Sequence, residues 1–160
     1  MLLLRAEAFA ARGNVDEAAA ALDQLTAAGV EIARDSHWLV RASVDLRRRD
    51  PLQAAQRLTT LSDEIAQDGR QLAITVQVAA LLGVAACDLE QYETAAVLFG
   101  HADAEQHRLD IVLRPSDRPL AEHAIETCRT ALGVDQYEEL AARGAASEWH
   151  HLPLIELDAT

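Results

Sequence analysis

Lysine is absent from this sequence, and all 14 basic residues are arginine. This absence excludes a P-loop, whose lysine contacts the phosphates, and any mechanism that needs a lysine Schiff base or a lysine base. Aromatic residues make up only 4% of the chain, and strand-favouring residues never alternate with polar ones for long, which excludes an all-β fold. No apolar run approaches the roughly 20 residues that a membrane-spanning helix requires.

Alanine, leucine and valine dominate a composition that is 50% apolar. Such small and aliphatic side chains allow close helix packing, and 160 residues are enough for one domain with a real core. The four prolines and seven glycines fall mostly where helices are expected to end. The sequence therefore predicts an all-α protein.

The charge balance is acidic, with 26 acidic against 14 basic residues and a formal net charge of -12. Such a surface repels phosphate backbones, so we expect no direct contact with nucleic acid. Cys87 and Cys128 each lie in an apolar helical pattern and are predicted to be buried free thiols. Without a signal-peptide pattern, the chain is expected to be cytoplasmic. The apolar start at residues 1–4 has no N-cap residue, which indicates a fragment of a larger protein.

Apolar periodicity and turn residues predict eight helices. Six form pairs, over residues 2–12 and 15–28, 32–49 and 51–67, and 70–88 and 91–107. Two further helices, 117–132 and 135–143, follow a proline-containing connection. Asp50 before Pro51 and Asp117 before Pro119 are predicted N-caps, and Gly133 is a predicted helix end.

The short turn inside each pair is followed by a common pattern. Each turn precedes a large apolar residue and then, three positions on, an alanine; the three sets are Val15 and Ala18, Leu52 and Ala55, and Tyr92 and Ala95. A small residue at this place lets two helices cross closely, and the large one fills the space between them. The spacing is a little above the period of about 34 residues that marks tetratricopeptide repeats.

These positions resemble the tetratricopeptide repeat, and the third unit resembles it best. There, Leu82-Gly83 matches the first helix, Tyr92 and Ala95 match the turn and crossing positions, and Phe99 and Ala102 match later packing positions. The resemblance implies an α-solenoid of antiparallel helix pairs over residues 1–112. A C-terminal capping helical hairpin is expected over residues 113–147 and an irregular tail over residues 148–160, which packs back as a short strand-like piece or binds a neighbouring chain.

The last third resembles the C-terminal helical region of large bacterial LuxR-type ATPase transcriptional regulators. The segments that carry this likeness are residues 98–104, 114–118, 130–137 and 141–144. The likeness departs after Gly144, and no helix-turn-helix follows. It implies that the chain is the C-terminal repeat region of such a regulator.

Histidines provide the strongest alternative that involves chemistry. His101 and Glu105, and Asp103 and His107, are each four residues apart and so share a helix face. We interpret them as a solvated polar face, with a metal-binding protein or small helical enzyme as the remote alternative. Arg47, Arg48 and Arg49 are interpreted as a solvated helix end, with docking of an acidic partner or of the parent's nucleotide module as the alternative.

The sequence thus predicts a non-catalytic interaction or sensor module with no catalytic residue, cofactor or metal. Its partner is expected to be a protein, a peptide or other domains of the parent protein, and a homodimer is left open. A general tetratricopeptide scaffold is the alternative to the LuxR-type regulator. The expected contact residues lie on the first helix of each pair: Arg5, Arg41, Asp45, Gln77 and Asp88.

Overall fold

The computed structural model of the protein describes residues 2–28, 34–68, 72–153 and 155–157. These residues form eight α-helices: α1 (Leu2–Ala11), α2 (Val15–Ala27), α3 (Arg34–Arg47), α4 (Pro51–Asp68), α5 (Leu72–Asp88), α6 (Tyr92–Leu109), α7 (Arg118–Leu132) and α8 (Val134–Ala145). A 3-10 turn, η1, covers Trp149–His151. The described ranges contain no strand, which confirms the all-α prediction. The predicted ends at residues 29, 32, 69 and 70 lie outside the described residues.

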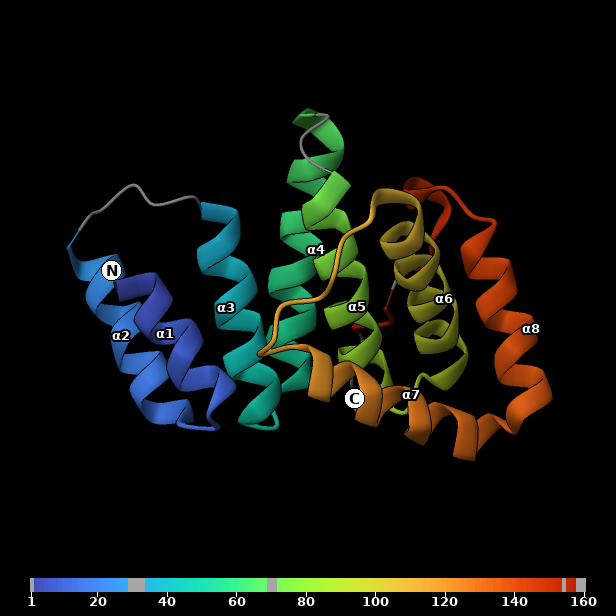
Figure 1. Ribbon diagram of the computed structural model, residues 1–160, viewed down its shortest axis with the longest axis horizontal. Helices are drawn as coiled ribbons and strands as arrows, with labels where there is room; N and C mark the ends of the chain where they lie inside the picture. The colour runs from blue at the N-terminus through green and yellow to red at the C-terminus, as the bar shows by residue number, and fades with distance from the viewer. Residues whose placement is uncertain (1, 29–33, 69–71, 154, 158–160) are drawn as a thin grey trace.

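Helices that follow one another in the chain lie side by side (Figure 1). From α1 to α6, every helix packs on the next one, and α1, α3 and α5 also contact each other in that order. α7 then crosses α5 and α6, and α8 lies along α6. Among the described residues, no helix combines the length and the apolar character that crossing a bilayer requires.

The turns inside the first three helix pairs have the same backbone geometry. Each turn has a residue with positive φ, namely Gly13 (78°), Arg49 (61°) and Glu90 (62°). The next amide donates to a carbonyl five residues back: Asn14 to Phe9 (2.9 Å), Asp50 to Asp45 (3.0 Å) and Gln91 to Ala86 (2.8 Å). This is the Schellman arrangement, which satisfies carbonyls at a helix end and reverses the chain in few residues.

This geometry corrects the register of the second unit by one residue. The sequence pattern made Leu52 and Ala55 equivalent to Val15 and Ala18 of the first unit. The turn geometry instead makes Pro51 and Ala54 the equivalent residues. An alanine pair hides the shift, because Ala54 and Ala55 are both fully buried. Equivalent pairs, Ala18-Ala19 and Ala95-Ala96, are buried in the other two units, so the prediction that these small residues are buried is confirmed.

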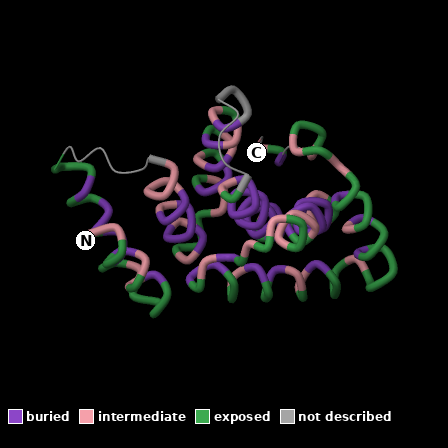
Figure 2. Tube along the Cα trace, turned by 45° about the horizontal axis from the view of Figure 1, so that its top comes forward, coloured by how far each residue is buried: buried purple, intermediate pink, exposed green. Residues whose placement is uncertain are grey.

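The longest run of buried residues lies on α5. Residues 75–87 of this helix are all buried, and Figure 2 shows the buried residues gathered in the middle of the molecule. A helix that is apolar all round is stable only when neighbours cover every face. Here α3, α4, α6 and α7 supply those neighbours.

The core has two parts. The main core joins buried side chains from α3 to α8 and Ile155 of the tail. A smaller N-terminal core joins α1 and α2 to Val40 and Val44 on α3. α3 is therefore the only described helix that supplies buried side chains to both.

Two glycines let α8 dock closely on α6. A Cβ built on Gly100 of α6 would overlap the Ala141 backbone of α8, and one built on Gly144 of α8 would overlap the Val97 backbone of α6. After α8, the tail returns to the helices: Ile155 is buried, and the Gln91 side chain makes hydrogen bonds of 2.7 and 3.0 Å to the Glu156 main chain. The described part of the tail, residues 148–153 and 155–157, thus packs back as a 3-10 turn and irregular chain, without a strand in these ranges.

Candidate functional site

Between α6 and α7 the chain crosses the face of the molecule that is formed by α3 and α5 (Figure 1). α6 ends at Leu109, and its C-cap residue, Asp110, adopts a left-handed conformation with φ 52°. Pro115 follows, and because a proline lacks an amide proton and keeps its predecessor out of the helical region, this stretch cannot continue a helix. We call residues 111–117 the crossing segment.

The side-chain amide of Gln77, on α5, makes two hydrogen bonds to main-chain atoms of the crossing segment. Its Nε2 donates to the Val112 carbonyl at 3.1 Å, and its Oε1 accepts from the Arg114 amide at 3.2 Å. Gln77 is buried. Because both contacts are to main-chain atoms, they hold an extended chain whatever side chains it carries.

Arg114, Asp117 and Ser43 form a buried charged network against α3. The Arg114 guanidinium contacts Asp117 Oδ2 through Nε at 2.7 Å and through Nη2 at 2.6 Å. Ser43 Oγ donates to Asp117 Oδ1 at 2.6 Å and accepts from Arg114 Nη2 at 3.1 Å. Asp117 is only 1% exposed. A carboxylate at this depth needs the guanidinium and the hydroxyl to replace its lost hydration.

Two further residues extend this network to neighbouring helices. Arg47 at the end of α3 donates to the Ser116 carbonyl and, at 3.3 Å, to the Ser43 carbonyl. Burial lowers the pKa of the Arg47 guanidinium, and the charge of Asp117 opposes that shift. On α1, Glu7 lies 3.5 Å from Arg114 Nη1, an ion pair without hydrogen-bond geometry. The crossing segment is thus bound by side chains of α1, α3 and α5.

Of the five predicted contact residues, only Gln77 touches the crossing segment in the contacts described above. Arg41 pairs with Asp23 of α2 at 2.5 Å. Asp45 pairs with Arg57 of α4 at 3.1 Å, and burial raises the Asp45 pKa although Arg57 lowers it. These two residues therefore join α3 to its neighbours.

The other two predicted contact residues lie apart. Arg5 is exposed on α1, 5.3 Å from the centre of the Phe9 ring, and lines a hollow of about 120 Å³ between α1 and α2. Asp88 is exposed at the end of α5, where partial burial raises its pKa against the opposing charges of Arg49 and His123. The contact of these five residues with a partner stays a prediction.

Sequence reasoning assigned a different role to Asp117 and Arg47. Asp117 was expected to cap α7, but its side chain makes no cap hydrogen bond because Ser43 and Arg114 bind it instead. Arg47 was expected at a solvated helix end, but it is half-buried under the crossing segment, while Arg48 and Arg49 are exposed. The sequence analysis named Arg114 only within the segment 114–118 and did not foresee its ion pair, although an arginine three residues before an aspartate can form one.

The histidine prediction is half right. His107 and Asp103 form an exposed pair at 3.6 Å, as expected of a solvated face. His101 is instead 5% exposed, and its Nδ1 lies 3.1 Å from the Ser147 carbonyl. The tail after α8 covers it, and helix periodicity alone carries no information on that contact. The predicted burial of Cys87 and Cys128 as free thiols is confirmed.

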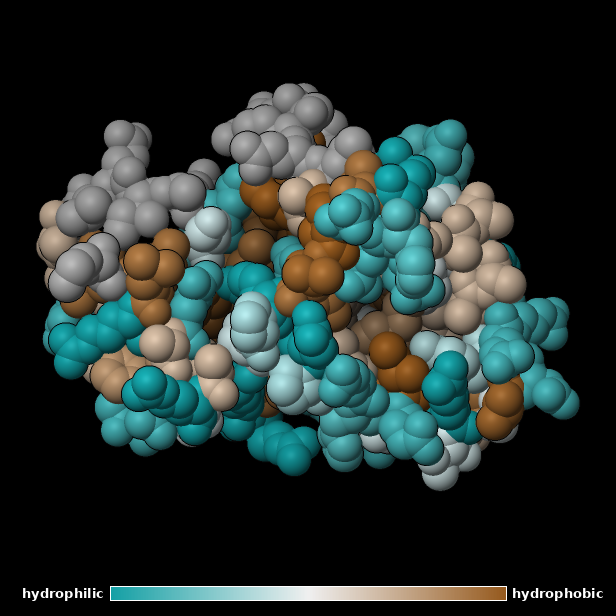
Figure 3. Space-filling view, viewed as in Figure 1, coloured by the Kyte–Doolittle hydropathy of each residue, from teal (hydrophilic) through white to brown (hydrophobic). Residues whose placement is uncertain are grey.

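Hydrophobic side chains are exposed on the same face of the molecule as this network. Val112 of the crossing segment is 70% exposed, and Figure 3 shows hydrophobic side chains along the middle of the face that the segment crosses, with hydrophilic surface on either side. The arrangement supplies main-chain recognition, one buried ion pair and an apolar side chain at the surface. These are the elements with which proteins bind extended segments of other chains.

Comparison with known proteins adds no relative to this description. No protein-family model, no curated protein and no solved structure matches the chain. The likeness to tetratricopeptide repeats and to LuxR-type regulators therefore rests on the residues quoted above, and the site rests on the contacts of the crossing segment.

Proposed function

We propose that this chain is a non-catalytic protein-interaction module of the tetratricopeptide kind, in which three helix pairs stack as an α-solenoid and α7 and α8 cap its end. Three Schellman turns of the same geometry, each followed by a buried alanine pair, support this architecture. In this arrangement α1, α3 and α5 are the first helices of the pairs and line the inner face.

The observation that carries the function is the pair of hydrogen bonds from Gln77 to the main chain at Val112 and Arg114. They are an example, within the chain itself, of the inner face holding an extended segment. A partner segment is recognised in the same way, with main-chain contacts for affinity and charged side chains for selectivity.

A peptide offered to an emptied face tests this function. The crossing segment is replaced by a Gly-Ser linker of equal length, and a fluorescein-labelled peptide of residues 110–118 is added. We expect saturable binding by fluorescence anisotropy, weakened by Gln77→Ala and unchanged by Gln56→Ala, which alters an exposed glutamine of α4. If the folded protein, verified by circular dichroism, does not bind the peptide, the inner face does not hold extended chains.

Within this class, we propose that the module is the C-terminal repeat region of a cytoplasmic LuxR-type bacterial transcriptional regulator. The residues at 98–104, 114–118, 130–137 and 141–144 support this narrower proposal. The parent open reading frame tests it directly. A nucleotide-binding ATPase module encoded upstream is the expected finding, and an open reading frame without one leaves only the general scaffold.

A further inference from the structure

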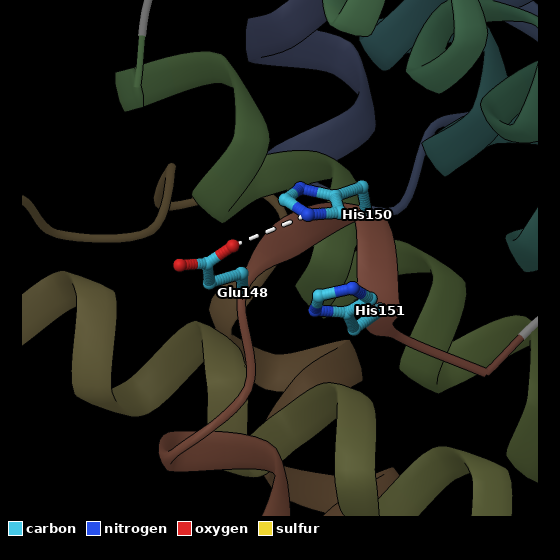
Figure 4. Close-up of side chains that lie close together, drawn as sticks. All are labelled: Glu148, His150 and His151. Atoms are coloured by element: carbon cyan, nitrogen blue, oxygen red, sulfur yellow. Dashed lines mark ion pairs between the residues drawn. The ribbon is translucent and has the colours of Figure 1, made fainter.

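The tail after α8 gathers three metal-ligating side chains on one short turn. Glu148 precedes η1, and His150 and His151 lie within it. One ligand atom from each residue can be chosen so that all three lie within 4.8 Å of one another. Figure 4 shows the carboxylate and the two rings close together on this turn.

The backbone that carries these side chains is anchored. Trp149, between Glu148 and His150, packs on the main core, and its ring centre lies 5.8 Å from that of His101. His101 in turn lies 3.1 Å from the Ser147 carbonyl, just before the turn. Leu152 also packs on the main core. The three ligands therefore project from a fixed loop although their own side chains are exposed.

The distances suit a metal after small side-chain rotations. His150 Nε2 lies 3.2 Å from Glu148 Oε2, and the ring centres of His150 and His151 are 4.1 Å apart. Metal–ligand bonds to imidazole nitrogen and carboxylate oxygen are about 2.0–2.2 Å long, so ligand atoms around one ion are about 3–4 Å apart. Exposed side chains can make this adjustment without disturbing the core.

The donor set selects the class of metal. Two imidazoles and one carboxylate favour late first-row divalent cations such as Zn²⁺ over Ca²⁺ or Mg²⁺, which prefer all-oxygen sites. Three protein ligands also leave a coordination position for water or another ligand. His150 lines a pocket of about 190 Å³ that includes Asp63 of α4 and Leu98 of α6, so such a ligand has room beside the turn.

We propose that Glu148, His150 and His151 bind one late first-row divalent cation, with Zn²⁺ as the probe. The inference does not rest on the proposed interaction function. The bound metal joins three side chains of the loop that covers His101. This loop lies beside the pocket that the tail, α4 and α6 line.

Zinc titration of the full 160-residue chain, prepared without a histidine tag, tests the site. By isothermal titration calorimetry and native mass spectrometry we expect one Zn²⁺ per chain. The double variant His150→Ala/His151→Ala is expected to bind at least about tenfold more weakly, because even loss of a residue that only supports a metal ligand costs 10–100-fold. Glu148→Gln, which keeps the shape and removes the charge, is expected to weaken binding in the same direction.

His107→Ala is the matched control, because His107 is also exposed and pairs with a carboxylate, Asp103. Its zinc affinity is expected to equal that of the unaltered chain. The proposal is overturned if no one-to-one binding occurs at micromolar Zn²⁺, if binding survives in the double variant, or if His107→Ala weakens it equally. Circular dichroism verifies the fold of each variant, and Glu148→Gln decides the question if the double variant does not fold.

Discussion

The buried carboxylate of Asp117 shows how one residue can organise a connection between helices. Its two oxygens bind the Arg114 guanidinium and the Ser43 hydroxyl, and the carboxylate itself is removed from solvent. In such a place the loss of hydration is offset only while every partner is present. The crossing segment therefore depends on each member of this small network.

Asp117→Ala is expected to lower the free energy of unfolding by about 3 kcal/mol, because it removes the buried partner of Arg114 and leaves only Glu7, 3.5 Å from Arg114 Nη1, to offset that charge. Ser43→Ala removes two hydrogen bonds of the Ser43 hydroxyl, to Asp117 and from Arg114, and is expected to cost about 1–3 kcal/mol. Urea denaturation followed by circular dichroism measures both. Asp16→Ala is the control, because the ion pair of Asp16 with Arg48 is exposed and is expected to contribute nothing measurable. Equal stability of the Asp117→Ala and Asp16→Ala variants would show that the network is unimportant.

Because Tyr137 is buried, we expect the protein to lose stability in alkaline solution. Burial raises the pKa of Tyr137 from 10.0 to about 12, although the charge of Arg129 lowers it. The pKa of Tyr137 is higher in the folded than in the unfolded state. Its contribution to the free energy of unfolding is therefore complete below pH 10 and is lost as the pH rises to 12. The loss approaches about 2–3 kcal/mol at the upper end.

Tyr137→Phe is expected to remove that part of the pH dependence. The measurement is urea denaturation at pH 9 and at pH 11.5 for both proteins. The hydrogen bond with Cys87 and burial also raise the pKa of the Cys128 thiol, so both proteins lose stability in this range and the effect of Tyr137 is the difference between their losses. An identical loss of stability in the phenylalanine variant would assign the effect to another group.

At the scale of helices, backbone contact decides how α8 meets α6. Alanine is a better helix former than glycine by about 1 kcal/mol, so propensity alone predicts that Gly100→Ala and Gly144→Ala stabilise the protein. The structure predicts the opposite, because each added Cβ would overlap a backbone carbonyl of the facing helix. Backbone cannot swing aside as a side chain does.

Each of these two substitutions is expected to destabilise the protein by about 1–3 kcal/mol and to raise the hydrogen exchange of α8. Gly83→Ala is the comparison, because the three atoms nearest to its added Cβ, the first at 2.7 Å, all belong to the Phe99 ring, which can rotate. Denaturation and exchange measured by mass spectrometry check the set. Stabilisation by Gly100→Ala would show that the two helices are further apart than described.

For the whole molecule, the division of the core predicts uneven stability. The N-terminal core is small and joins the rest through Val40 and Val44 of α3. Few buried apolar contacts mean a low free energy of local opening. α1 and α2 are therefore expected to open before α5 and α6.

Hydrogen exchange by mass spectrometry should show the lowest protection in α1 and α2. Val44→Ala is expected to lower the protection of α1 and α2 further and to leave that of α6 nearly unchanged, because Val44 belongs to the N-terminal core. Val97→Ala, in α6, is the converse control because it belongs to the main core. Uniform protection over all helices would contradict this division.

Much of the helical architecture was determined by the sequence alone. Local signals place helix ends within a residue or two, as at Pro51 behind Asp50, whose Oδ1 accepts from the Gln53 amide at 3.1 Å, and at Gly133, which has φ 83°. Such signals act between residues close in the chain. The same locality explains the register error at Ala54 and Ala55, because two adjacent buried alanines fit the pattern equally well.

The candidate sites were decided by tertiary structure. Asp117 meets Ser43 across 74 residues of chain, His101 is covered by a tail that starts more than 40 residues later, and the turn carrying His150 is held against the core by Trp149. Helix periodicity tells which residues share a face but not which distant segment will cover that face. Burial of a polar side chain depends on that cover, because it removes water and makes a partner necessary.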